Sequence, residues 1–235
     1  MILSMRYFLS FLFAFILCGC TEMSSVLYDT SARQTNPADH PVFLSPPTFH
    51  RFVSLDRHQP NGRLSKGKFL VAGRKIRDPR FMETVILLVQ HDLHGTVGLV
   101  VNRPTTARLA DLFPEIREQH GAEHFTYIGG PVGMAQGLLL IRQPDRAEES
   151  QWVFDDVYVS SSRTVLERLV KKPDGKTKFR AYAGYAGWFF GQLEQEVMTG
   201  DWRVVQADAE TIFTKSAAEI WPELIRKTEI IRIEI

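Results

Sequence analysis

The pattern of hydrophobic and polar positions from about residue 64 onward predicts short strands separated by turns. Thr84–Gln90 is almost continuously aliphatic and β-branched, which is typical of a strand that is covered on both faces. The turn His91–Gly95 leads into a second apolar run, so the two runs predict a hairpin that ends before Pro104, which has no N–H to donate. The predicted strands are Phe69–Ala72, Thr84–Gln90, Thr96–Val101, Phe125–Ile128, Leu138–Ile141, Trp152–Val159 and Lys178–Tyr182.

Helical periodicity predicts fewer elements than strand periodicity does. Three serines can cap a helix over Arg163–Lys171, and Leu109–Ile116 predicts a shorter helix. A C-terminal helix begins either at a capping box that starts at Ser216 or at Pro222, and Glu229–Ile235 predicts a last strand. Because strict alternation of strand and helix is missing, the predicted fold class is α+β, with a mixed sheet packed with several short helices.

The glycine- and aromatic-rich stretch Gly187–Met198 is read as a helix with two unlike sides. The core-facing side consists of Phe189, Phe190, Leu193 and Val197. The opposite side carries Trp188, Gly191 and Gln192, flanked by Gly187, although each glycine costs roughly 0.5–1 kcal/mol relative to Ala in a helix. The pattern therefore predicts a close approach to this side, either by another layer of the protein, which is favoured, or by a ligand or partner.

Motifs for catalysis and metal binding are incomplete. Gly129–Gly133 lacks the Lys-Ser/Thr ending of a phosphate loop and reads as a turn, and His91, Asp92 and His94 lack a distant partner for a metal site. Asn102 either bonds a neighbouring turn or faces a cleft. We predict no catalytic, metal or cofactor-binding residues, and enzymatic activity stays uncertain. The predicted ligand or partner surface consists of Asn102, Gly129, Gly130, Gly187, Trp188, Gly191 and Gln192.

Composition and charge narrow the class of partners. The chain has 235 residues, is 44% hydrophobic and 23% charged, and carries a formal net charge of +1. These values indicate a globular protein with a substantial core. The balanced charge and the absence of a basic recognition helix give no reason to expect a nucleic-acid partner.

The N-terminus predicts a lipoprotein signal peptide over residues 1–19. Arg6 precedes the apolar run Tyr7–Leu17, which is too short for a membrane span of roughly 20 residues, and the run ends in Leu-Cys-Gly-Cys. Cys20 is the predicted lipidation site, with an uncleaved anchor or a misassigned start as alternatives. Residues 20–63 predict a flexible tether and 64–235 the folded domain. Thr21, in place of aspartate, slightly favours the outer membrane within the cell envelope; the alternative is the cytoplasm.

Four motifs in order resemble the bacterial AlgH/YqgE family. They are RDPRFMETVILLVQHDLHGTVG at 77–98, GLVVNRP at 98–104, GGPV at 129–132 and GYAGWFFGQLEQEVMTGDW at 184–202. The resemblance implies an α+β fold on a bulged, barrel-like sheet, without an established activity. Arg142 stands where the family usually has a histidine. We therefore predict a lipid-anchored binding or scaffolding module of unknown ligand, with a protein as a possible partner. The alternatives are a cytoplasmic transcriptional regulator and a hydrolase with an unrecognised site.

Overall fold

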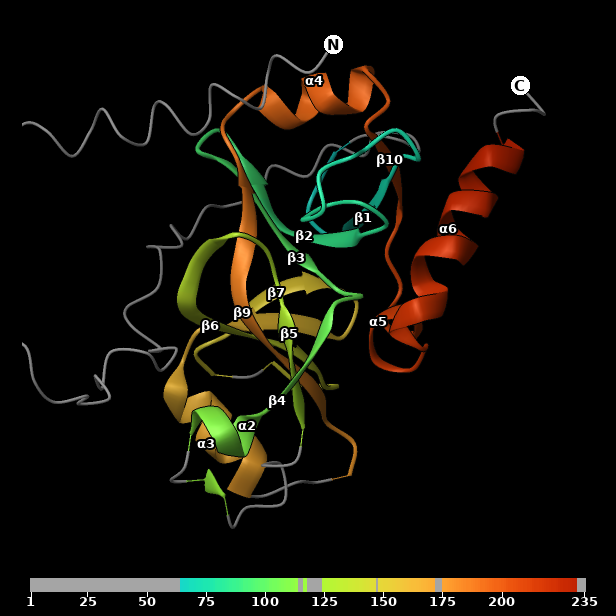
Figure 1. Ribbon diagram of the computed structural model, residues 1–235. Coiled ribbons are helices and arrows are strands. Elements are labelled where there is room, and N and C mark those ends of the chain that lie inside the picture. The colour runs from blue at the N-terminus through green and yellow to red at the C-terminus, as the bar shows by residue number, and fades with distance from the viewer. Residues whose placement is uncertain (1–63, 114–115, 118–123, 147, 172–174, 232–235) are drawn as a thin grey trace, which may run out of the picture. The chain divides into compact units, whose positions relative to one another are not determined.

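The computed structural model describes residues 64–113, 116–117, 124–146, 148–171 and 175–231 (Figure 1). All of them belong to one compact unit within residues 37–235. The predicted signal peptide, Cys20 and the tether over 20–63 lie outside the described residues.

Ten strands and five helices make up the described part of the chain. The strands are β1 (Lys68–Ala72), β2 (Val85–Asp92), β3 (Gly95–Val100), β4 (Pro104–Arg108), β5 (Phe125–Ile128), β6 (Val132–Arg142), β7 (Gln151–Phe154), β8 (Val157–Ser160), β9 (Lys178–Trp188) and β10 (Trp202–Gln206). The helices are α2 (Leu109–Leu112), α3 (Arg163–Lys171), α4 (Gln192–Met198), α5 (Ala209–Phe213) and α6 (Ala217–Ile231).

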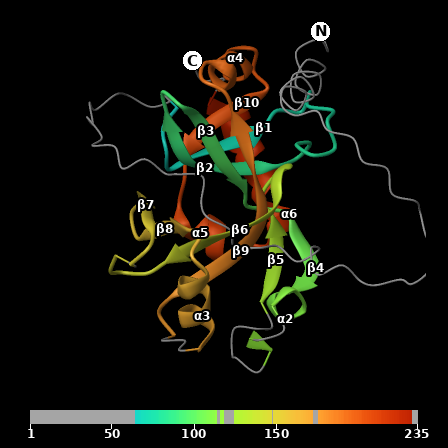
Figure 2. The same cartoon turned by 90° about the vertical axis from the view of Figure 1, so that its left-hand side faces the viewer.

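The strands form one curled sheet, a half-barrel whose order is β10-β1-β2-β3-β9-β6-β8-β7 (Figures 1 and 2). β5 lies beside β9 and pairs with it in parallel, β4 pairs with β5, and the other described pairings are antiparallel. Register shifts interrupt the β2–β3 and β6–β9 pairings, so the sheet is bulged. The predicted α+β class with a mixed, bulged, barrel-like sheet and short helices is confirmed.

Two hydrophobic clusters cover opposite faces of the sheet at β6 and β9. Leu138, Leu140 and Tyr182 belong to the larger cluster, and the alternate residues Leu139 and Ala181 belong to a smaller one with α2 and α3. Since successive side chains of a strand point to opposite faces, both faces of these two strands are buried. β9 therefore has little freedom to move, and this fixes the position of its C-terminal end at Trp188.

Local sequence signals located several elements correctly. The β2–β3 hairpin forms, and α3 has the predicted bounds. Ser162 Oγ accepts a hydrogen bond of 3.3 Å from the backbone N–H of Val165, so the predicted serine cap is confirmed. α6 begins directly after Ser216, and Pro222 lies inside the helix.

Other predicted elements are wrong in extent or type. Trp152–Val159 is two strands, β7 and β8, because Asp155 turns the chain with φ = 41°. The β2–β3 pairing ends at Val100, before Pro104, as predicted, but Pro104 itself starts a further strand, β4, where it faces Tyr127 and its missing N–H is tolerated. The helix predicted over Leu109–Ile116 ends at Leu112 in α2, with Phe113 as its C-cap. β10 and α5 were not predicted, and the strand predicted at Glu229–Ile235 is helical as far as Ile231.

The helix predicted over Gly187–Met198 is also wrong in its first five residues. β9 continues through Gly187 to Trp188, and α4 starts only at Gln192. The two phenylalanines assigned to the core, Phe189 and Phe190, lie in the intervening turn and are 68% and 67% exposed. Alternate residues of β9 from Tyr182 to Trp188 are buried, so the strand period of two extends through the glycines.

Candidate functional site

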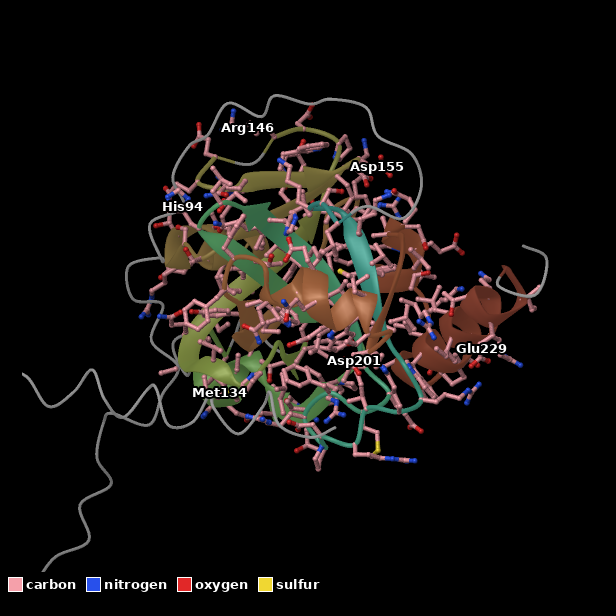
Figure 3. The ribbon with its side chains drawn as sticks, turned by 90° about the horizontal axis from the view of Figure 1, so that it is seen from above. His94, Met134, Arg146, Asp155, Asp201 and Glu229 are labelled. Atoms are coloured by element: carbon pink, nitrogen blue, oxygen red, sulfur yellow. The ribbon has the colours of Figure 1, made fainter. Side chains whose placement is uncertain are left out.

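Large apolar side chains are exposed at the end of the domain where β9 passes into α4. The group, here called the aromatic end, consists of Leu93, Phe189, Phe190 and Met198, which are 79%, 68%, 67% and 86% exposed. The β2–β3 turn and the β9–α4 turn touch, since a Cβ atom added to Gly95 would lie 2.5 Å from the carbonyl oxygen of Trp188. Figure 3 looks down on this end, with α4 across its centre and His94 of the β2–β3 turn at the upper left.

A single carboxylate fastens α4 to the sheet below it. Glu196 Oε2 accepts a hydrogen bond of 2.9 Å from the indole N–H of Trp188 and another of 2.9 Å from that of Trp202. Glu196 Oε1 accepts a third, of 3.1 Å, from the side-chain amide of Gln192. The indole rings are 7% and 3% exposed and meet edge to face, with centroids 6.1 Å apart. Two members of the predicted surface, Trp188 and Gln192, therefore hold α4 in place.

The turn that carries the phenylalanines has a defined backbone. Gln192 Oε1 accepts a hydrogen bond of 3.2 Å from the backbone N–H of Phe189. Gly191, at the N-terminus of α4, adopts the left-handed conformation with φ = +80°. Leu193 is fully buried below the turn. These restraints fix the path of the backbone that presents Phe189 and Phe190 to solvent.

A histidine connects the β2–β3 hairpin to α4. His91 Nδ1 shares a hydrogen bond of 2.8 Å with Thr96 Oγ1, and His91 Nε2 lies 3.7 Å from Glu194 Oε1. Thr96 is only 4% exposed and pairs with Trp188 across the sheet. The Thr96 hydroxyl is buried. The contacts of His91 with Thr96 and Glu194 therefore join the β2–β3 hairpin to α4.

The glycines of the predicted surface differ in how closely other parts of the chain approach them. A Cβ atom on Gly129 would lie 2.2 Å from the carbonyl oxygen of Gly184, and one on Gly130 would lie 2.2 Å from the carbonyl carbon of Tyr185. These two glycines allow the β5–β6 connection to cross β9 closely. A Cβ atom on Gly187 would make only an ordinary contact of 3.5 Å, and one on Gly191 would meet nothing within 4 Å. The close approach predicted at Gly187 and Gly191 is therefore wrong.

Asn102 bonds the backbone of the turn before β2. Its Oδ1 accepts a hydrogen bond of 2.9 Å from the N–H of Val85, and its Nδ2 donates one of 2.9 Å to the carbonyl of Glu83, which has φ = +57°. Thr96 faces Trp188, β3 continues to Val100, about 13 Å farther at strand spacing, and Asn102 follows in the next turn. The structure therefore separates Asn102 from the aromatic end.

Three further kinds of feature could mark a site in the described residues: metal-ligand clusters, membrane-spanning helices and a buried tyrosine hydroxyl. No group of three or more His, Cys, Asp and Glu side chains could hold a metal ion within the described ranges. Among the helices that the structure describes, none is long and apolar enough to cross a membrane. The Tyr182 hydroxyl is buried and has no hydrogen-bond partner among the described residues, and burial raises its pKa above the ordinary value.

The residues that sequence reasoning missed are Leu93, Met198, Glu196 and Trp202. Their role depends on the contact between two turns and on where β9 ends, and neither is a local property of the sequence. The one local signal is Gly191 directly before an amphipathic helix, which is typical of a change of chain direction at a helix start.

Comparison with known proteins places this fold and these motifs in one family. A model of the AlgH-like family DUF179 matches residues 69–231. A UPF0301 protein of Ralstonia nicotianae is 39% identical over 163 residues, covering 68% of this chain and 85% of the relative. A UPF0301 protein of Magnetococcus marinus is 32% identical over 166 residues, covering 70% and 89%.

Two solved structures share the fold. The solution structure of the AlgH protein from Pseudomonas aeruginosa is similar with a TM-score of 0.58 and 29% identity, covering 73% of this chain and 92% of that one. A crystal structure of a Corynebacterium diphtheriae protein has a TM-score of 0.59 at 22% identity, covering 74% and 90%, and supports the fold alone. The chain belongs to the AlgH-like family.

Proposed function

We propose that this chain is a lipid-anchored binding module of the bacterial cell envelope, and that the aromatic end is the surface that binds a protein partner. The observation that carries the proposal is the exposure of the four side chains of the aromatic end on a restrained framework. Single exposed apolar residues are ordinary, but several gathered at one place are typical of interaction sites.

The energetics of the aromatic end support binding. Burying a large apolar side chain contributes about 1.5–3 kcal/mol. The turn that carries Phe189 and Phe190 is already ordered by Gln192 and Glu196, so a partner would lose little free energy in ordering it. The polar groups beside these residues, the Trp188 indole and the Thr96 hydroxyl, have internal partners and are buried, which supports binding over catalysis.

The anchored location rests on the N-terminal sequence. Arg6, the apolar run Tyr7–Leu17 and Cys20 match a lipoprotein signal, and Thr21 favours the outer membrane. Mass spectrometry of the N-terminal peptide from the native host should find an acylated Cys20. Cys20→Ala should prevent acylation and leave an uncleaved precursor, whereas the matched change Cys18→Ala should be processed normally. An unmodified N-terminus on a cytosolic protein would contradict the anchor.

Partner binding is tested separately by photo-crosslinking in living cells. A photoreactive phenylalanine analogue at Phe190 should form a discrete adduct with one envelope protein, because this side chain is exposed at the aromatic end. The same analogue at Ile230, which is 57% exposed on α6, is the matched control and should not form that adduct. Identical adducts at both positions, or none at Phe190, would refute the assignment of this surface.

A further inference from the structure

Three carboxylates around the aromatic end have no lysine or arginine partner among the residues that the structure describes. This acidic rim consists of Asp92, Glu194 and Glu196, and the partners described for it are amide, indole and imidazole groups. Asp201, by contrast, is 3.4 Å from the ammonium group of Lys75. An apolar centre with an uncompensated negative rim selects an occupant that carries both apolar and cationic side chains.

The N-terminal arm, here residues 21–63, contains a segment that combines apolar and cationic side chains. Residues 41–58 include seven large apolar residues, a density that a solvated spacer does not need. The second half, Phe49–His58 (FHRFVSLDRH), combines four of them with two arginines, two histidines and a single aspartate. The first part of the arm, from Thr21 to His40, has no comparable combination.

We propose that Phe49–His58 docks on the aromatic end of the same molecule, with its apolar side chains against Leu93, Phe189 and Phe190 and its arginines toward the acidic rim. This goes beyond the proposed function, because it makes the arm a competitor for the surface that a partner binds. It also explains how these apolar side chains are shielded in the absence of a partner.

The entry point of the arm allows this contact. The backbone N–H of Gly67 donates a hydrogen bond of 2.8 Å to the carbonyl of Leu88, so the arm joins the domain beside β2. Leu93 lies five residues beyond Leu88, about 17 Å at strand spacing. Eight residues lie between His58 and Gly67, and the nine Cα–Cα steps that join them can span up to about 30 Å. The segment therefore reaches the aromatic end, at an effective concentration on the order of 1 mM.

A lipid bilayer is the main competing occupant. Exposed Phe, Leu and Met side chains can insert into a membrane interface, but the acidic rim, which has no described lysine or arginine partner, would face anionic headgroups. The charge around the aromatic end therefore favours the basic segment over an anionic bilayer.

Hydroxyl-radical footprinting of two purified proteins, 21–235 and 64–235, tests the proposal. The shorter one contains residues 69–231, which the AlgH-like family model matches, and a family member of which this chain covers 92% is folded in solution. Oxidation of Phe189 and Phe190 should be up to about tenfold slower in the longer protein, if the segment's dissociation constant is a tenth of its effective concentration. Oxidation of Ile230 should be equal in both proteins.

Paired variants in the arm identify the segment. Phe49→Ser with Phe52→Ser should restore fast oxidation of the aromatic end, whereas the matched pair Val26→Ser with Leu27→Ser should leave it slow. Equal oxidation of the two unmodified proteins would overturn the proposal, as would restoration by both pairs. Protection that depends on protein concentration would indicate a second copy, and protection only on phosphatidylethanolamine–phosphatidylglycerol vesicles would indicate a bilayer; both results overturn it. A negative result here leaves the crosslinking test of the proposed function intact.

Discussion

Replacing Glu196 by alanine tests how α4 is held. The change removes the shared acceptor of two indole N–H groups, those of Trp188 and Trp202, which are 7% and 3% exposed. Each buried donor left without an acceptor costs about 1–3 kcal/mol, and the less buried Gln192 amide can turn to water at little cost. We therefore expect Glu196→Ala to lower the free energy of unfolding by about 4 kcal/mol.

Denaturant unfolding followed by tryptophan fluorescence, together with thermal melting, measures this effect. A loss of about 4 kcal/mol corresponds to a decrease in Tm of roughly 8–16 °C for a chain of this size. Glu196→Gln can keep the oxygen that accepts from both indoles and loses only the bond from Gln192, so it should cost much less than Glu196→Ala. Glu194→Ala, on the same helix but 42% exposed, is the matched control and should change stability by less than about 1 kcal/mol. Equal unfolding of Glu196→Ala and the unmodified protein would refute the account of α4.

Three further changes test other parts of the structure by denaturant unfolding. Gly129→Ala should destabilise the domain by about 1–3 kcal/mol through overlap with the β9 backbone, whereas Gly187→Ala should be tolerated; equal costs would contradict the crossing. Asn102→Ala should cost about 1–3 kcal/mol because it leaves a buried N–H of β2 unpaired, and an unchanged midpoint would contradict this. Hydrogen bonds from Lys215 and a second lysine lower the pKa of Glu223 to about 2. Stability should therefore fall as the pH drops from 4.5 to about 2, and Glu223→Gln should reduce that slope.

Elements with a strong local signal could be predicted from the sequence. β2 is a continuous aliphatic run, and α3 combines a serine cap with a helical apolar stripe, so local residues alone specify both. The fold class followed from the balance of such elements. β10 and α5 are short and have mixed burial, so their polarity does not distinguish them from loops.

The error at the end of β9 has a specific physical cause. In β9 the buried positions before Trp188 include Gly184 and Ala186, which are too small to produce a hydrophobic period of two. Their size is set by the close crossing of Gly129 and Gly130, a contact between segments more than fifty residues apart. Without knowledge of that contact, the sequence pattern predicts a glycine groove on a helix and places Phe189 and Phe190 in the core.

At the aromatic end, the stability of the fold and the proposed binding of a partner depend on different residues. Trp188 and Glu196 are committed to internal hydrogen bonds, whereas Phe189 and Phe190 project from the turn that those bonds support. Phe189→Ser with Phe190→Ser should therefore change the free energy of unfolding by no more than about 0.5 kcal/mol per site. The same double variant should abolish the adduct formed from a photoreactive residue at Leu93. If the double variant melts many degrees lower than the unmodified protein, Phe189 and Phe190 belong to the core. They would then not form an exposed binding surface.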